Sequence, residues 1–222
     1  MDSEHILELA SDLVRQAQSA DGQRRIIIAM AGIPGSGKTF LSTQLQQKIN
    51  QQAGSDMCAV LPLDGFHLSR QQLQALPNAK EALRRRGAHW TFDGGGFVNT
   101  LHAIRQQGSA TVRAPTFDHA VGDPVADAIA VEPHHRVVIA EGLYLHVDGE
   151  QPWSRIHGMA DQTWWVQPRN PQLAQQRLAA RHVQAGLAAS EEEALLRIQL
   201  NDSLNAAFVE QTRCQPTRTI YN

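Results

Sequence analysis

A glycine-rich run of eight residues has the composition that binds a chain of phosphates: Gly32, Ile33, Pro34, Gly35, Ser36, Gly37, Lys38 and Thr39. The run fits the pattern G-x-x-x-x-G-K-[ST], in which glycines let successive backbone N–H groups turn inward around an anion. In that pattern the Lys38 ammonium reaches the β- and γ-phosphates, and the Thr39 hydroxyl binds Mg²⁺. The run therefore predicts a site for ATP or another nucleoside triphosphate together with Mg²⁺.

The segments on either side of this run supply the context that the pattern needs. Residues 26–31 are a short apolar run rich in β-branched side chains, which is typical of a strand buried on both faces of a parallel sheet. Residues 40–52 contain no helix breaker, so a helix is expected to present its positive N-terminal end to the anion. The alternative, a glycine-rich turn with an exposed lysine, does not require this order of strand, loop and helix.

Two other predicted strands end in an acid, Asp64 after residues 60–63 and Glu141 after residues 137–140. In open α/β sheets ligands gather at the carboxyl ends of the strands, so both carboxylates are expected beside the phosphate loop. Asp64 is the candidate base that accepts the proton of a substrate hydroxyl. Glu141 is the candidate metal ligand beside Thr39, with Asp64 as a further candidate for the metal. The alternatives are a turn-forming Asp-Gly pair and an ordinary glutamate at a strand end.

Arg177 and Arg181 lie four residues apart on a predicted helix at 171–185, so they share one face of it. This helix has Asn170 as its N-cap, a proline at its first position and a glycine after its end. An arginine pair on such a segment can neutralise the charge that develops on a transferred phosphate, which makes both residues candidate catalytic groups. The alternative is a solvated helix face.

Further residues are candidates for contacts with the substrate: His67, Arg86, Asp93, Arg113 and His119. Arg86 ends a basic run that begins at Arg84 and that could equally be a solvated helix end. Asp93 precedes a helix and could serve as its N-cap instead. Arg113, Asp118 and His119 lie in or after a predicted strand and could line the same cleft.

The remaining pattern alternates strands with helices, which predicts an α/β domain with a mainly parallel sheet. Further strands are expected at 57–63, 110–114, 136–141, 161–167 and 217–221. Further helices are expected at 4–18, 97–104 and 190–209.

The composition excludes several classes of protein. The 222 residues contain 20 Lys+Arg and 22 Asp+Glu, a formal net charge of −2, so no nucleic-acid partner is expected. The longest apolar run is far shorter than the roughly 20 residues that span a bilayer, and the N-terminus lacks the features of a signal peptide. Two cysteines make no disulfide framework, and the adjacent His134 and His135 match no zinc spacing. We expect a cytoplasmic protein with no membrane partner.

Among proteins with a phosphate loop, two large classes lack support. GTPases need a guanine-specificity segment of the Asn-Lys-x-Asp type, and transporter ATPases need a Leu-Ser-Gly-Gly-Gln-like signature, and the sequence contains neither. The two acids and the arginine pair instead fit a small-molecule kinase. A nucleotide-dependent switch or regulatory ATPase that acts on a protein partner is the alternative that stays open.

The order of these motifs resembles the phosphoribulokinase/uridine kinase/pantothenate kinase family of P-loop kinases. After the phosphate loop, the resemblance rests on residues 63–67, 87–93, 115–119, 139–142 and the arginine-bearing helix. Within the family the chain looks most like the bacterial branch of nucleoside/nucleotide kinase-like or fructose-transport-system kinase-like proteins. Asp64-Gly65-Phe66 is closer to pantothenate kinases than to uridine kinases, and Phe117 stands where nucleoside-phosphorylating members tend to have a tyrosine.

The resemblance implies a three-layer α/β/α P-loop fold with a mainly parallel five-stranded sheet and a helical lid. We expect one kinase domain over 1–222, with an N-terminal helix at 1–20, a substrate-side region at about 66–130 and a lid at about 170–190. The implied reaction uses ATP and Mg²⁺ and phosphorylates a hydroxyl of a small metabolite, such as a sugar, a nucleoside or a pantothenate-like acid. The identity of the acceptor and the choice between monomer and homodimer stay open.

Overall fold

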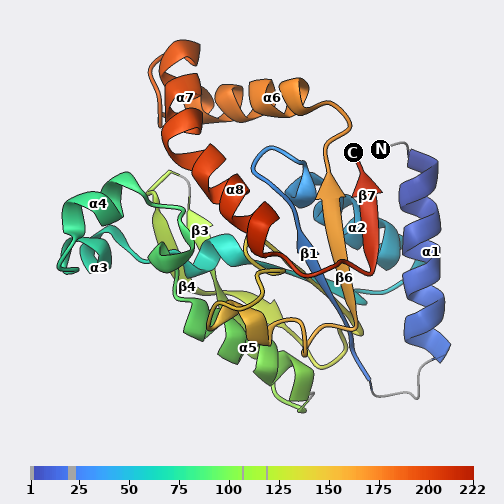
Figure 1. The fold of residues 1–222 in the computed structure, drawn as a ribbon. Coiled ribbons are helices and arrows are strands. Elements are labelled where there is room, and N and C mark those ends of the chain that lie inside the picture. The colour runs from blue at the N-terminus through green and yellow to red at the C-terminus, as the bar shows by residue number, and fades with distance from the viewer. Residues whose placement is uncertain (1–2, 20–23, 107, 119) are drawn as a thin grey trace.

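The computed structural model describes residues 3–19, 24–106, 108–118 and 120–222. Its centre is a five-stranded sheet in the order β2-β5-β1-β6-β7, in which every pair of neighbours is parallel. The strands are β2 (Cys58–Pro62), β5 (Val137–Glu141), β1 (Ile26–Ala31), β6 (Gln162–Gln167) and β7 (Arg218–Tyr221). Helices cover both faces of this sheet (Figure 1), which confirms the predicted three-layer α/β/α fold.

Alternate residues of the central strand β1 enter two separate hydrophobic cores. One core contains Ile28 together with α1 (Ser3–Ser19) and α2 (Lys38–Ala53). The other core contains Ile27 together with α5 (Gly94–Gln106). All six residues of β1 are buried, which explains why its sequence is apolar without interruption.

The region predicted as a lid, at about 170–190, contains α6 (Pro171–Gln184). We use the name lid for α6 together with the helices that follow it, α7 (Glu191–Arg197), the π-helix η4 (Ile198–Asp202) and α8 (Ser203–Thr212). Helix α6 begins where the sequence predicts, because the Asn170 side chain accepts a hydrogen bond from the Leu173 N–H at 3.0 Å. The helix predicted at 190–209 begins at its Ser190 cap but contains the π-helix in its middle. The apolar periodicity did not predict this interruption.

Two strands form a separate antiparallel hairpin beside the main sheet, β3 (Val112–Asp118) and β4 (Asp123–Val131). The strand predicted at 110–114 therefore exists, but it begins later and does not join the parallel sheet. Gly122, at φ +75°, closes the hairpin by donating its N–H to the Asp118 carbonyl at 2.7 Å. A connection this short permits only antiparallel pairing, because parallel neighbours need a crossover of a dozen or more residues.

Short helices fill most of the chain between β2 and α5. They are η1 (Leu63–Phe66), α3 (Arg70–Gln74), α4 (Ala79–Arg84) and η2 (His89–Thr91). A further short helix, η3 (Trp153–Arg155), lies elsewhere in the chain, after β5. Figure 1 shows α3 and α4 on the side of the molecule away from α1. The helices α3, α4, η2 and α5 and the hairpin lie in the region at about 66–130, whose role on the substrate side stays a prediction. Within the described ranges, no helix is long and apolar enough to cross a membrane.

Candidate active site

The phosphate loop connects β1 to α2, as the sequence predicts, and two of its glycines have positive φ angles. Gly35 has φ +77° and Gly37 has φ +89°, a backbone region that glycine adopts without steric cost. A Cβ atom on Gly35 would also lie 2.6 Å from the carbonyl oxygen of Ala174 in α6. The glycines therefore let the loop turn and let the lid helix approach it closely.

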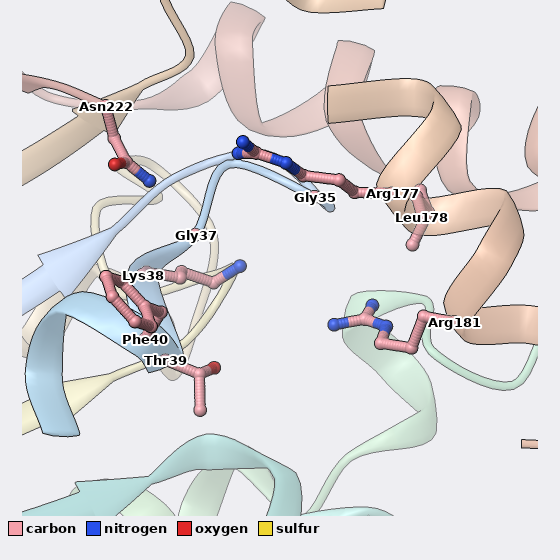
Figure 2. Close-up of a pocket in the computed structure, with 9 residues that line it drawn as sticks. All are labelled: Gly35, Gly37, Lys38, Thr39, Phe40, Arg177, Leu178, Arg181 and Asn222. Carbon is pink, nitrogen blue, oxygen red and sulfur yellow. The ribbon is translucent and has the colours of Figure 1, made fainter. Parts of the chain in front are cut away.

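A cavity of about 510 Å³ lies between the phosphate loop and α6. Figure 2 shows the Lys38 ammonium and the Arg181 guanidinium pointing toward one another across it, with Arg177 one helical turn before Arg181. The cavity is lined by Gly35, Gly37, Lys38, Thr39, Phe40, Arg177, Leu178, Arg181 and Asn222. Three cationic side chains and a helix N-terminus at one cavity suit a polyanion such as a triphosphate.

Glu141 and Thr39 are in direct contact at the end of the sheet. Glu141 is the last residue of β5 and pairs in register with Met30, two residues before the phosphate loop. The Thr39 hydroxyl donates to the Glu141 carboxylate at 3.0 Å, and Glu141 is only 4% exposed. Hydroxyl and carboxylate oxygens are the hard donors that Mg²⁺ prefers. The two predicted metal ligands therefore fit a magnesium site.

Burial favours the neutral forms of Lys38 and Glu141 and therefore shifts the pKa values of both groups. Burial lowers the pKa of Lys38, while the negative charges of Glu141 and Asp64 oppose that shift. Burial likewise raises the pKa of Glu141, against the effect of the nearby Lys38 ammonium. Bound phosphates would favour the charged ammonium and a bound cation the charged carboxylate. The pair is therefore suited to binding charged ligands.

Asp64 is the exposed acid of this site. It lies in η1 directly after β2, and β2 neighbours β5, so Asp64 and Glu141 stand at adjacent strand ends. The charge of Asp64 acts on both Lys38 and Glu141. A Cβ atom on Gly65 would clash with the Pro115 carbonyl of β3, so the glycine is needed for the hairpin to pack here. The Asp-Gly pair thus combines a packing requirement with a solvent-facing carboxylate.

His67 is hydrogen-bonded to the backbone of Asp64. Its Nδ1–H donates to the Asp64 carbonyl at 2.8 Å, because a carbonyl oxygen can only accept. The imidazole ring contacts the rings of Phe92 and Phe117, at centroid distances of 4.0 and 4.9 Å. His67 is therefore close to the candidate base, and its contact with an acceptor stays a prediction.

The arginines of the basic run 84–86 have partners within the protein. Arg84 pairs with Glu81 on the surface, and Arg85 donates to the Asn205 side chain at 2.9 Å. Arg86 donates to two carbonyls and one carboxylate, namely Gly122 O at 2.6 Å, Leu68 O at 2.9 Å and Asp123 Oδ1 at 2.6 Å. Arg86 thus fastens the hairpin to the chain near His67, and a contact between Arg86 and an acceptor stays a prediction.

The structure describes two of the three remaining candidates. Asp93 caps α5, since its Oδ1 accepts from the Gly96 N–H at 2.8 Å, which is the alternative that the sequence left open. Arg113 is exposed on β3, with its guanidinium 3.4 Å from the Asp127 carbonyl. His119 lies outside the described residues. Acceptor contacts of these three residues stay predictions.

His134 and His135 lie beside Asp56, away from the cavity. The His135 Nδ1 accepts from the Glu132 N–H at 2.8 Å, so its Nε2 carries the proton and donates to Asp56 at 3.2 Å. In that tautomer the Nε2 has no lone pair to offer a metal ion. We therefore interpret this cluster as a hydrogen-bonded contact between two loops.

Several residues near the cavity were not predicted from the sequence. Phe40 lines the cavity and is 60% exposed, which is unusual for a large aromatic side chain. Mostly buried polar side chains also gather under the lid: His182, Asn201, Asp202 and Asn205. Polar residues inside a helical pattern were the only available signal, and that signal does not distinguish buried positions from solvated ones.

No protein-family model matches the chain. A Schizosaccharomyces pombe protein named "Putative uridine kinase C227.14" is 40% identical over 194 residues, which cover 87% of this chain and 82% of that protein. An Aspergillus versicolor protein named "ATP-dependent kinase-like protein notR'" is 43% identical over 154 residues, which cover 68% of this chain and 88% of that protein.

Two solved structures extend the similarity to the whole fold. A protein from Silicibacter sp. TM1040, described as a "putative fructose transport system kinase", has a TM-score of 0.81 and 32% identity and covers 97% of this chain and 98% of its own. YFH7 from Saccharomyces cerevisiae has a TM-score of 0.87 at 20% identity over 98% of this chain and 99% of its own, which supports the fold alone. With the phosphate loop, the parallel sheet and the lid already in place, these similarities lead to one conclusion: the chain belongs to the phosphoribulokinase/uridine kinase/pantothenate kinase family of P-loop kinases.

Proposed function

We propose that this protein transfers the γ-phosphate of ATP, with Mg²⁺, to a hydroxyl group of a small metabolite. The observation that carries the proposal is the exposed carboxylate of Asp64, at the strand end next to the buried Glu141 and within reach of the charge of Lys38. A nucleotide switch needs no solvent-facing acid at this position, because it has no acceptor hydroxyl to deprotonate. Sugars, nucleosides and pantothenate-like acids are the acceptor classes that we propose.

In this mechanism the acceptor oxygen attacks the γ-phosphorus while the bond from that phosphorus to the β–γ bridging oxygen breaks, so that ADP leaves. Asp64 accepts the proton of the acceptor hydroxyl. Lys38, Arg177 and Arg181 offset the negative charge on the transferred phosphoryl group. Thr39 and Glu141 would hold Mg²⁺, which when bound neutralises charge on the β- and γ-phosphates.

An acceptor screen with the variant Asp64→Asn tests the proposal. ATP consumption is measured with a panel of sugars, nucleosides including uridine, and pantothenate, and the mass of each product is determined. We expect acceptor-dependent ATP consumption by the wild type and a fall in kcat of about a hundredfold or more in the variant. The variant should still bind Mg·ATP, because Asp64 does not line the nucleotide cavity.

Asp12→Asn is the matched control, since Asp12 is an acid on the surface of α1 that pairs with Arg15. This variant should keep the kcat of the wild type. If Asp64→Asn phosphorylates the acceptor as fast as the wild type, Asp64 is not the base. If no acceptor raises ATP consumption and a protein partner binds only with nucleotide present, the regulatory ATPase is favoured instead.

A further inference from the structure

The lid contains a polar cluster that the proposed mechanism does not use. Its members are His182 on α6, Arg197 on α7, and Asn201 and Asp202 on the π-helix η4. The side chains of His182 and Asp202 are only 6% and 16% exposed. Each of the four residues has a buried polar atom that lacks a hydrogen-bond partner among the described residues. Such groups are rare in folded proteins, and π-helices are frequent at functional sites, so the cluster calls for an explanation.

The π-helix is held in place by the acceptor side of the molecule. Hydrogen bonds join η4 and the start of α8 to the segment 85–87, among them Asn201 Nδ2 to Arg86 O at 3.1 Å, Asn205 Nδ2 to Gly87 O at 3.2 Å, and Arg85 Nη1 to Leu200 O at 3.1 Å. The Asp202 carboxylate therefore sits on a supported piece of backbone. A charge held in this way can orient a mobile partner without having to reorganise.

Arginines provide the counter-charges of Asp202. Burial raises the pKa of Asp202, and the positive charges of Arg197, Arg181 and Arg85 oppose that rise. The imidazole of His182 is nearer, with its Nε2 at 3.7 Å from the Asp202 Oδ2, but burial lowers the pKa of His182 to about 4. His182 is therefore neutral near pH 7 and leaves the arginines to balance the carboxylate.

Of the three arginines whose charges act on Asp202, Arg181 is the one that lines the nucleotide cavity. It is exposed, and its side chain forms no hydrogen bond or ion pair with any residue in the described ranges. Figure 2 shows its guanidinium directed across the cavity toward Lys38. Its charge acts on Lys38, Glu141 and Asp202, and the next residue of α6, His182, lies 3.7 Å from the Asp202 carboxylate. Arg181 is thus close to both the supported carboxylate and the phosphate-binding residues.

We propose that Asp202 is a positioning residue for Arg181. Its buried carboxylate attracts the guanidinium and restricts it to the cavity side of α6, where it meets the γ-phosphate of ATP. This inference rests on the proposed kinase function and concerns the same nucleotide site. A correctly positioned Arg181 would favour the binding of ATP over ADP, because only ATP carries the phosphate that Arg181 would contact.

The ratio of the dissociation constants of Mg·ADP and Mg·ATP tests this role in the absence of any acceptor. The ratio is measured by titration calorimetry for the wild type, Arg181→Ala, Asp202→Asn and the double variant. We expect Arg181→Ala to reduce the preference for ATP about tenfold, the effect of one charge-assisted contact. Asp202→Asn should reduce the preference severalfold, and it should add nothing in the Arg181→Ala background.

The direction of the change in nucleotide affinity distinguishes a positioning role of Asp202 from the simple loss of its charge. Removing a negative charge near the site would by itself tighten the binding of both nucleotides. Glu192→Gln is the matched control, because it removes an exposed acid from α7 of the same lid. It should leave the preference for ATP unchanged.

Three results would overturn the inference: an unchanged preference in Asp202→Asn, tighter binding of both nucleotides, or losses that add in the double variant. If the wild type itself does not bind Mg·ATP, the proposed function fails and the inference fails with it. If Asp202→Asn does not fold, Asp202→Glu takes its place in the same cycle. That variant keeps the charge but moves it by one methylene, so it should give a partial loss that again disappears without Arg181.

Discussion

Arg84 and Arg86 belong to one basic run, yet the structure predicts a large loss of stability from substitution of Arg86 and a small one from the same substitution of Arg84. The Arg86 side chain is 15% exposed and pairs with Asp123, which is 28% exposed. The Arg84 side chain is 62% exposed and pairs with Glu81, which is 45% exposed. We therefore compare Arg86→Met with Arg84→Met, since methionine keeps an unbranched stem and removes the charged group.

The expected magnitudes follow from burial and from the number of partners. Breaking a buried ion pair costs about 3–5 kcal/mol, and the partial exposure of Asp123 places Arg86→Met near the lower end, at about 3 kcal/mol. The variant also leaves the carbonyls of Gly122 and Leu68 without the Arg86 donor. An exposed ion pair one helical turn apart contributes only about 0.3–0.5 kcal/mol, which is the expected cost of Arg84→Met.

Urea denaturation followed by tryptophan fluorescence measures both free energies of unfolding. In a thermal melt, a loss of about 3 kcal/mol corresponds to a fall in Tm of about 6–12 °C for a chain of this size. Arg86→Met should also raise the KM of the acceptor, because Arg86 fastens the hairpin that packs on Gly65 beside Asp64. Equal losses of stability in the two variants would refute the reasoning, and a large effect on KM with an unchanged Tm would show that Arg86 contacts the acceptor directly.

Two further predictions concern the pH dependence of stability and the nucleobase. The Nε2–H of His146 donates to the Ala29 carbonyl at 2.9 Å, and burial lowers its pKa to about 4, below the ordinary value of 6.5. The unfolded chain therefore binds this proton first, so stability should fall as the pH drops from about 6.5 to 4, by a total of about 3 kcal/mol from this group. Urea unfolding of the wild type and His146→Gln at pH 7, 5.5 and 4.5 measures this loss, and parallel pH profiles of the two proteins would contradict it. Phe40 follows the phosphate-binding residues and is exposed at the cavity, so Phe40→Ala should weaken ATP binding about tenfold through lost base stacking. Binding of inorganic tripolyphosphate should not change, and equal losses for both ligands would rule out contact with the base.

The sequence by itself determined the parts of this protein whose structure depends on residues close together in the sequence. The phosphate loop is one such part, because a single turn between β1 and α2 brings its glycines, Lys38 and Thr39 together. The carboxylates of Asp64 and Glu141 were also predictable, since each follows an apolar strand and the carboxyl ends of parallel strands share one edge of the sheet. The start of α6 was predictable because its cap is local.

Only the tertiary structure decided which polar residues are buried and what they contact. Arg84 and Arg86 have the same residue type and the same local context, and they differ because a hairpin some 37 positions along the chain reaches only Arg86. The same holds for Asp202, whose position under the lid depends on a π-helix and on contacts more than 100 residues away in sequence. Long-range contacts of this kind leave no periodic trace in the sequence, because burial at one position depends on the packing of distant segments.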